Sequence, residues 1–133
     1  MIRYEIAGKE NDIREHIELL YSHLKVYISR EEITGDILFC FENGRVMGAY
    51  IEDELVGAVV GVYTPFFEKF HVAHLAVRDE HRKKGIGKEL MERIVPEGTD
   101  VSVHLNQENP DTMRFYERIG FKKTHLRFQK FKE

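Results

Sequence analysis

Apolar residues recur along this chain with two different spacings, and their order predicts a domain that contains both helices and strands. Spacings of three and four residues predict four helices, at residues 12–24, 29–41, 86–95 and 109–119. Alternating or β-branched runs predict strands at 2–6, 45–51, 55–63, 71–77 and 101–105, with a last strand from Phe121 onward. No repeat, linker or low-complexity segment separates these elements. We therefore expect a single α/β domain over residues 1–133, built on a mixed central sheet with flanking helices.

Polar residues and glycine mark where several of these elements end. The segment Ser29–Glu32 has the form of a capping box at the start of the second helix. Gly35 weakens that helix, however, and the apolar run Ile37–Phe41 would also suit a strand. Asn109 is a suitable N-cap for the last helix, and Gly120 is a suitable C-terminal cap. The state of residues 37–41 stays open on the sequence alone.

The composition suits a compact domain and argues against several classes of protein. Of the 133 residues, 42% are hydrophobic and 11% are aromatic, which is enough to form a core. The one cysteine, Cys40, rules out an internal disulfide, and its apolar neighbours predict an inert core thiol. The chain shows neither a signal-peptide layout nor a membrane-spanning run, so we expect a cytoplasmic protein that does not bind membranes. The net charge of −3 argues against general nucleic-acid binding, despite basic residues late in the chain.

The segment that is most informative about function is a cationic glycine loop between an apolar strand and a helix. His81–Lys88 reads HRKKGIGK and follows the apolar run Val72–Val77. Main-chain N–H groups at a helix start have no partner within the helix, and the helix dipole adds positive charge there. Gly85 and Gly87 lack a Cβ, so a phosphate can approach the main chain. The loop also carries the cations Arg82, Lys83, Lys84 and Lys88.

Two common phosphate-binding glycine loops do not fit this segment. A nucleoside-triphosphate loop needs a glycine where Arg82 stands and a Ser or Thr where Glu89 stands. A dinucleotide-binding loop needs a third glycine where Leu90 stands. A surface turn with solvated lysines is the simplest alternative, but the strand before the loop and the helix after it favour an anion site.

The pattern Arg82-x-x-Gly85-x-Gly87 after a Leu-Ala-Val strand resembles the pyrophosphate loop of the GCN5-related N-acetyltransferase (GNAT) superfamily. The segment Asn109–Phe121 strengthens the resemblance, because it holds Phe-Tyr, a short spacer and then Gly-Phe, as the family's segment does. The similarity covers roughly residues 45–128, whereas the N-terminal third matches only in the order of its elements.

The resemblance implies a GNAT-like fold in which the fourth and fifth strands splay apart and admit acetyl-coenzyme A (acetyl-CoA). Main-chain groups of Leu75, Ala76 and Val77 would bond the pantetheine amides, and one N–H would face the thioester oxygen. The pyrophosphate would lie on the loop, with Arg82, Lys83, Lys84, Gly85, Ile86, Gly87 and Lys88 as its binding residues. Asn109 would contact the cofactor, act as an N-cap, or do both. No residue spacing typical of a metal site supports a metal.

Two side chains are candidates for the acid and the base that amine acetylation requires. The resemblance makes Tyr116 the proton donor to the departing thiolate, and a phenol and a thiol differ in pKa by roughly two units. The alternative is that the Tyr116 ring only packs on the sheet. His71 is the candidate base, because histidine titrates near neutrality, and strand alternation places it on one face with Leu75 and Val77. The alternative for His71 is a strand histidine without a catalytic role; His74 falls on the opposite face and is expected to be structural.

These observations predict an N-acetyltransferase that moves an acetyl group directly from acetyl-CoA to a primary amine of a small molecule or peptide. The alternative is a non-catalytic acyl-CoA sensor of the same fold. Glu52–Glu54 and Glu68 suggest a cationic acceptor, although a solvated face explains them equally well. Phe66 and Phe67 either line an acceptor pocket or close the edge of the core. Because relatives in the superfamily often form dimers, a homodimer is a further expectation.

Overall fold

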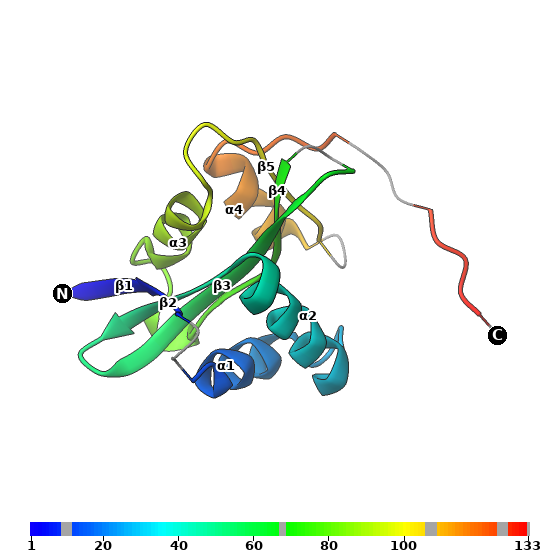
Figure 1. Cartoon of the computed structure of the whole chain (residues 1–133). Coiled ribbons are helices and arrows are strands. Elements are labelled where there is room, and N and C mark those ends of the chain that lie inside the picture. Colours follow the sequence, from blue (N-terminus) through cyan, green and yellow to red (C-terminus); the bar gives the residue numbers. More distant parts are fainter. Residues whose placement is uncertain (9–11, 67–68, 106–108, 125–127, 133) are drawn as a thin grey trace.

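The computed structural model describes residues 1–8, 12–66, 69–105, 109–124 and 128–132, and Figure 1 shows their arrangement. A five-stranded sheet carries helices on both faces. In chain order the elements are β1 (Ile2–Ile6), α1 (Arg14–Leu24), α2 (Arg30–Asn43), β2 (Arg45–Ile51), β3 (Glu54–Thr64), β4 (Lys69–Val77), the short 3-10 helix η1 (Asp79–His81), α3 (Ile86–Ile94), β5 (Val101–Val103) and α4 (Pro110–Arg118).

The strands lie in the sheet in the order β1-β2-β3-β4-β5. The pairs β1–β2, β2–β3 and β3–β4 are antiparallel, whereas β4 and β5 are parallel, so the sheet is mixed as expected. A parallel neighbour needs a crossover, which α3 supplies. This crossover brings the loop after β4 and the N-terminus of α3 to the end of β4.

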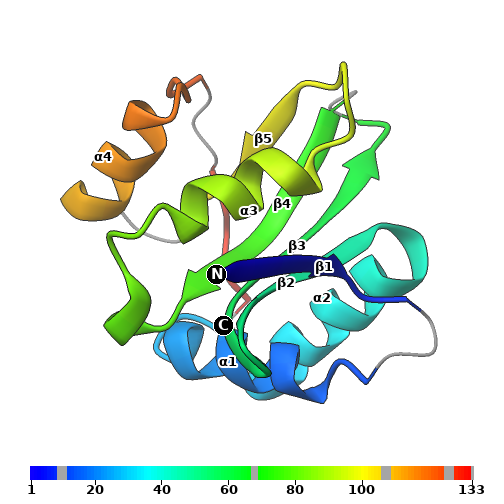
Figure 2. The same cartoon turned by 90° about the vertical axis from the view of Figure 1, so that its left-hand side faces the viewer.

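Helices α1 and α2 cover one face of the sheet, and α3 and α4 lie on the other (Figure 2). Each face has its own apolar core. The α1–α2 side buries Leu19, Leu20, Ile33, Ile37, Cys40, Val46, Leu55, Ala58 and Val60. The α3 side buries Met47, Val56, Val59, Phe70, Val72, Ile86, Leu90, Met91 and Ile94. Within the described part of the chain, no helix is both long and apolar enough to cross a membrane.

The second helix decides the point that the sequence left open, the state of residues 37–41. Ser29 caps it by accepting a hydrogen bond from the Glu32 N–H at 3.1 Å, and the helix continues through Ile37–Phe41 rather than becoming a strand. Cys40 is buried on its inner face, where burial raises the pKa of the thiol to about 11. A thiol with this pKa is protonated at neutral pH, which agrees with the expected inert role.

The expected last strand from Phe121 is wrong for the described residues. Residues 121–124 and 128–132 lie in no helix or strand. Instead, Gly120 turns with φ of 104°, and the Phe121 N–H bonds the Tyr116 carbonyl at 2.9 Å, so the segment first completes the end of α4. The fifth strand is also shorter than expected, because it ends at Val103 rather than at Leu105.

Candidate functional site

The strand β4 has a neighbour on both edges along only part of its length. It pairs with β3 from Lys69 to Val77, but β5 pairs only with Phe70–Val72. Figure 2 shows β5 beside the end at which β4 begins. Among the described residues, the stretch Ala73–Val77 therefore has a strand on its β3 side alone. The three residues expected to bond pantetheine, Leu75, Ala76 and Val77, all lie in this open half.

Because β4 contains a bulge, its two histidines are oriented differently from the prediction. Val60 of β3 pairs with His74 and Gly61 pairs with Val72, so Ala73 is an extra residue without an opposite partner. An extra residue reverses the alternation of faces from that point. Phe70, Val72, Leu75 and Val77 accordingly face the α3 side, while Ala73 and Ala76 face the α1–α2 side. The prediction that His71 shares a face with Leu75 and Val77, opposite to His74, is therefore wrong.

His71 lies on the α2 side of the sheet, close to Ser102 of β5 and to His104, which follows β5. Its Nδ1 atom is 2.9 Å from the Ser102 hydroxyl, and its ring centroid is 4.6 Å from that of His104. Burial lowers the pKa of His71 below its ordinary value, and the nearby imidazoles of His104 and His74 lower it further. His71 is thus neutral at pH 7, which is the form that a base requires. Ser102 was missed because the parallel register that pairs it with His71 is not visible in the sequence.

The loop before α3 has the geometry expected of an anion site. Gly85 is the N-cap residue and has a left-handed conformation with φ of 81°, which disfavours side chains. Gly85 has no side chain that could accept a hydrogen bond from the first turn. Intrahelical bonding begins with the Glu89 N–H, which donates to the Gly85 carbonyl at 3.0 Å. Lys83 also has a positive φ, of 64°. Backbone turns of this kind present successive N–H groups to an anion.

The cations around this loop are exposed, and Arg82, Lys84 and Lys88 each contact a nearby side chain. Arg82 lies 3.3 Å from Asp79, and Lys88 lies 4.0 Å from Glu92. The Lys84 ammonium donates to Nδ1 of His81 at 3.1 Å. Exposed pairs of this kind contribute little, at most about 1 kcal/mol each. A bound phosphate would therefore displace them at small energetic cost.

The two loop glycines differ in what an added side chain would meet. A Cβ at Gly85 would meet nothing within 4 Å, so this side of the main chain is open. A Cβ at Gly87 would lie only 3.2 Å from the Phe115 ring of α4. Gly87 thus allows α4 to pack closely against the start of α3. The side chain of Ile86 is buried in the core, so only its main chain can serve the loop.

Tyr116 lies on α4 and its ring packs in the partly buried rim of the α3-side core. The neighbouring rings are Phe115 at 5.0 Å and Phe121 at 5.3 Å between centroids, both edge-on. Burial raises the pKa of Tyr116 to about 12. The packing role weighed for this residue is therefore present, and the hydroxyl is held in its protonated form.

Asn109 acts as the N-cap of α4. Its Oδ1 atom accepts hydrogen bonds from the N–H groups of Asp111 at 3.0 Å and Thr112 at 3.2 Å. This was the simpler of the two roles weighed for Asn109. A cofactor contact would have to use the amide nitrogen of the side chain, because Oδ1 already has these partners.

The acidic residues of the β2–β3 turn lie far from His71. Glu54 begins β3, whereas His71 pairs with Val62, eight residues further along that strand and roughly 26 Å away. These three acids instead line a surface pocket of ≈ 680 Å³, together with Glu15, Ile51, Leu55, Arg78 and His81. Glu52–Glu54 therefore lie away from the candidate base, and the suggestion that they favour a cationic acceptor stays a prediction. Phe66 is 93% exposed, so it does not close the core, and Phe67 and Glu68 lie outside the described residues.

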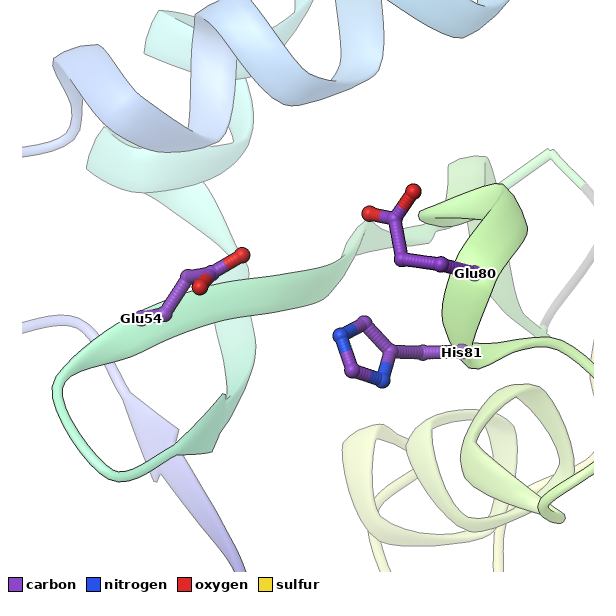
Figure 3. A group of neighbouring side chains, drawn as sticks. All are labelled: Glu54, Glu80 and His81. Carbon is purple, nitrogen blue, oxygen red and sulfur yellow. The ribbon is translucent and has the colours of Figure 1, made fainter.

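Glu54 and His81 of this pocket and the neighbouring Glu80 lie close enough to share a cation, because their ligand atoms are within 4.8 Å of one another. Figure 3 shows Glu54 at the start of β3 facing Glu80 and His81 of η1. Protein cations already lie against the same group. Lys84 contacts His81, and Arg78 lies 4.0 Å from Glu54. These contacts make the group part of an exposed ion-pair network next to the glycine loop.

The profile of the acetyltransferase (GNAT) domain family matches residues 42–123, which is more than half of the chain. The chain belongs to the GNAT acetyltransferase family. The matched stretch runs from the end of α2 to beyond α4, so it includes the open half of β4, the glycine loop and Tyr116. GNAT acetyltransferases take the acetyl group from acetyl-CoA. The expected family, fold class and cosubstrate are thus confirmed.

Among curated proteins, the chain is similar to N-alpha-acetyltransferase 30. The Xenopus laevis protein is 31% identical over 129 residues, which span 90% of this chain and 45% of the relative. The Homo sapiens protein is 30% identical and is matched over 34% of its length. The chain thus spans less than half the length of these GNAT relatives.

Solved structures share the fold at low sequence identity. An aminoglycoside N-acetyltransferase, AAC(6')-Iy, in complex with CoA has a TM-score of 0.79 and 12% identity, and the match covers 99% of this chain and 95% of that one. A possible acetyltransferase from Clostridium difficile 630 has a TM-score of 0.70, also at 12% identity. At such identities the likeness concerns the fold alone.

Proposed function

We propose that this GNAT protein transfers an acetyl group from acetyl-CoA directly to a primary amine, within a ternary complex of enzyme, cofactor and acceptor. One observation supports this most strongly: the open half of β4 is followed, after η1, by the Gly85-capped start of α3. A pantetheine arm along Leu75–Val77 would then continue to a diphosphate on the loop. The binding residues on the loop would be Arg82, Lys83, Lys84, Gly85, Ile86, Gly87 and Lys88, with Asn109 near the end of the arm.

The reaction needs a neutral amine, and His71 is suited to provide it. In the proposed step the amine nitrogen attacks the thioester carbon, and the C–S bond breaks as the tetrahedral intermediate collapses. His71 takes the proton that the amine loses, and Tyr116 gives a proton or a hydrogen bond to the departing thiolate. A main-chain N–H in the Leu75–Val77 stretch would stabilise the oxyanion.

The acceptor belongs to one of two classes that relatives suggest. The curated relatives are named as N-alpha-acetyltransferases, which supports a peptide α-amine. The structural neighbour is named as an aminoglycoside acetyltransferase, which supports a small polyamine. We favour the peptide α-amine, because the sequence similarity to the first class is much higher, at 31% against 12%.

The decisive experiment combines release of free thiol from acetyl-CoA with mass spectrometry of the acceptor. Peptides with free α-amines should release thiol and gain one acetyl group, whereas peptides with a blocked α-amine should not. The dependence of kcat/KM on pH should show an acidic limb with its midpoint below pH 6.5, because the pKa of His71 is lowered and activity is lost as His71 becomes protonated. In His71→Gln the rate should fall by about 10²-fold or more and that limb should disappear. A full rate in His71→Gln would exclude His71 as the base.

A non-catalytic acyl-CoA sensor is the second candidate, and the environment of Tyr116 favours it. The raised pKa of this phenol makes it a weak acid toward a thiolate. A sensor would be stabilised by acetyl-CoA but would release no thiol with any amine. The thiol assay therefore separates the two candidates.

A further inference from the structure

Asp36 of α2 and His74 of β4 form a contact that joins a helix to the centre of the site. The Nε2 atom of His74 lies 2.8 Å from Oδ2 of Asp36. The His74 side chain is 10% exposed and the Asp36 side chain is 48% exposed. The pair therefore reaches from the interior of the α2 side to the surface.

The contact lies at the point where β4 and β5 part. Val72 and Val103 are the last residues that pair between these two strands. Ala73, the next residue of β4, is the bulge, and His74 is the first residue after it that again pairs with β3. Asp36 thus holds the residue that directly follows the bulge, within the open half of β4.

The bulge separates two groups of atoms that the proposed reaction must hold in a fixed relation. His71 precedes the bulge and is tied to β5 through Ser102. The main-chain groups of Leu75–Val77 follow the bulge and have no such tie to β5. A bulge interrupts the regular ladder of hydrogen bonds and bends its strand, so its geometry depends on contacts from outside the strand. The bond from α2 to His74 is such a contact.

We propose that Asp36 and His74 are positioning residues for acetyl transfer, because they fix the bulge of β4 and with it the distance from His71 to the amides of Leu75–Val77. This inference rests on the proposed function. Small errors in such a distance matter, since a displacement of about 1 Å of reacting groups can lower a rate by about 10²-fold. The pair also places the His74 imidazole near that of His71.

Three variants test the role of the pair. In Asp36→Ala we expect kcat to fall by about 10- to 100-fold, while the KM for acetyl-CoA and the melting temperature stay close to those of the wild type. Asp36→Asn should recover most of the rate, because its amide oxygen can still accept from Nε2 of His74. Glu42→Ala is the matched control, since Glu42 is another exposed acid of α2, and it should leave all three values unchanged.

Amide hydrogen exchange gives a readout that needs no activity. Asp36→Ala should speed exchange in residues 72–75 of β4 and leave α1 unaffected. Wild-type kcat and wild-type exchange in Asp36→Ala would overturn the proposal. So would a parallel loss of kcat, cofactor affinity and melting temperature, which would indicate a general structural role. If the wild-type chain acetylates no amine, the proposed function fails, whereas the tie between Asp36 and the bulge still stands or falls on the exchange data.

Discussion

Burial decides how Tyr116 can act on a thiolate. With the pKa of Tyr116 at about 12 and that of an alkyl thiol near 8.5, full proton transfer is uphill by about 5 kcal/mol. The smaller gap expected from unperturbed groups was roughly two units. In this environment the hydroxyl is better suited to donate a hydrogen bond to the thiolate than to lose its proton completely. Complete transfer would require a bound cofactor that makes the surroundings of Tyr116 more polar.

Replacing Tyr116 by Phe removes the hydroxyl and keeps the ring between Phe115 and Phe121. We expect kcat to fall by about 10²-fold, because the leaving thiolate loses its donor, while the affinity for acetyl-CoA changes by less than about twofold. Steady-state kinetics and a binding titration measure these two values. Tyr63→Phe is the control, since Tyr63 is 54% exposed near the end of β3. An unchanged kcat in Tyr116→Phe would remove the donor role.

At the scale of single residues, the sequence predicted those features that depend on local structure. Ser29, Gly85 and Asn109 stand at the starts of α2, α3 and α4, and each was recognisable from its residue type and its neighbours. The orientation of His71 was not predictable, because one extra residue at position 73 reverses the faces of β4 and leaves no mark in the hydrophobic pattern. The partners Ser102 and Asp36 depend on packing between segments far apart in the chain, which a local pattern does not specify.

At the scale of elements, the turn into α3 depends on a left-handed residue. Gly85→Val would place a β-branched side chain at φ of 81°, which such residues avoid. We expect this variant to lose most of the thermal stabilisation that acetyl-CoA gives. At an acetyl-CoA concentration of about 100 times Kd, binding should stabilise the wild-type fold by about 2.7 kcal/mol and raise its melting temperature by roughly 10 °C.

Gly85→Asn provides the matched control for the loop, because asparagine tolerates the left-handed region. It should keep most of the shift with acetyl-CoA. Thermal melts of both variants with and without the cofactor give the answer. A full shift in Gly85→Val would mean that the loop does not hold the diphosphate.

The elements themselves were largely predictable, and the exceptions have physical reasons. Helix α3 was clear because its apolar residues recur at helical spacing behind the glycine loop. The strand expected from Phe121 failed because Phe121 packs beside Tyr116 and its N–H completes the end of α4. The contact between Gly87 and Phe115 was also hidden, since it depends on how α3 and α4 meet rather than on either helix alone.

At the scale of the whole molecule, a buried histidine makes stability depend on pH. His16 of α1 is 3% exposed, its Nδ1 atom has no partner in the described part of the chain, and its Nε2 atom lies 3.5 Å from the Tyr50 hydroxyl. Burial lowers the pKa of His16, although Glu15 and Asp12 act in the opposite direction. The unfolded chain therefore binds a proton at this residue more readily than the folded chain does.

The free energy of unfolding should accordingly fall as the pH drops below about 6.5, with a slope of up to about 1.4 kcal/mol per pH unit from this residue. In His16→Gln the slope between pH 7 and pH 5 should be smaller, whatever the absolute stability of the variant. Urea unfolding at several pH values measures both slopes. Equal slopes for the two proteins would show that His16 does not contribute.

The order of the strands in the sheet is also their order in the sequence. Few residues separate β2 from β3 and β3 from β4 in the sequence, so these pairings form between nearby segments. In contrast, β5 comes after α3 and pairs with only three residues of β4. Segments that make few hydrogen bonds and contacts to the rest of a domain unfold locally at a lower free-energy cost than its core. A molecule bound along the open edge of β4 would thus slow the local opening of β5 and α4. The amide protection of the antiparallel strands should stay unchanged when that molecule binds.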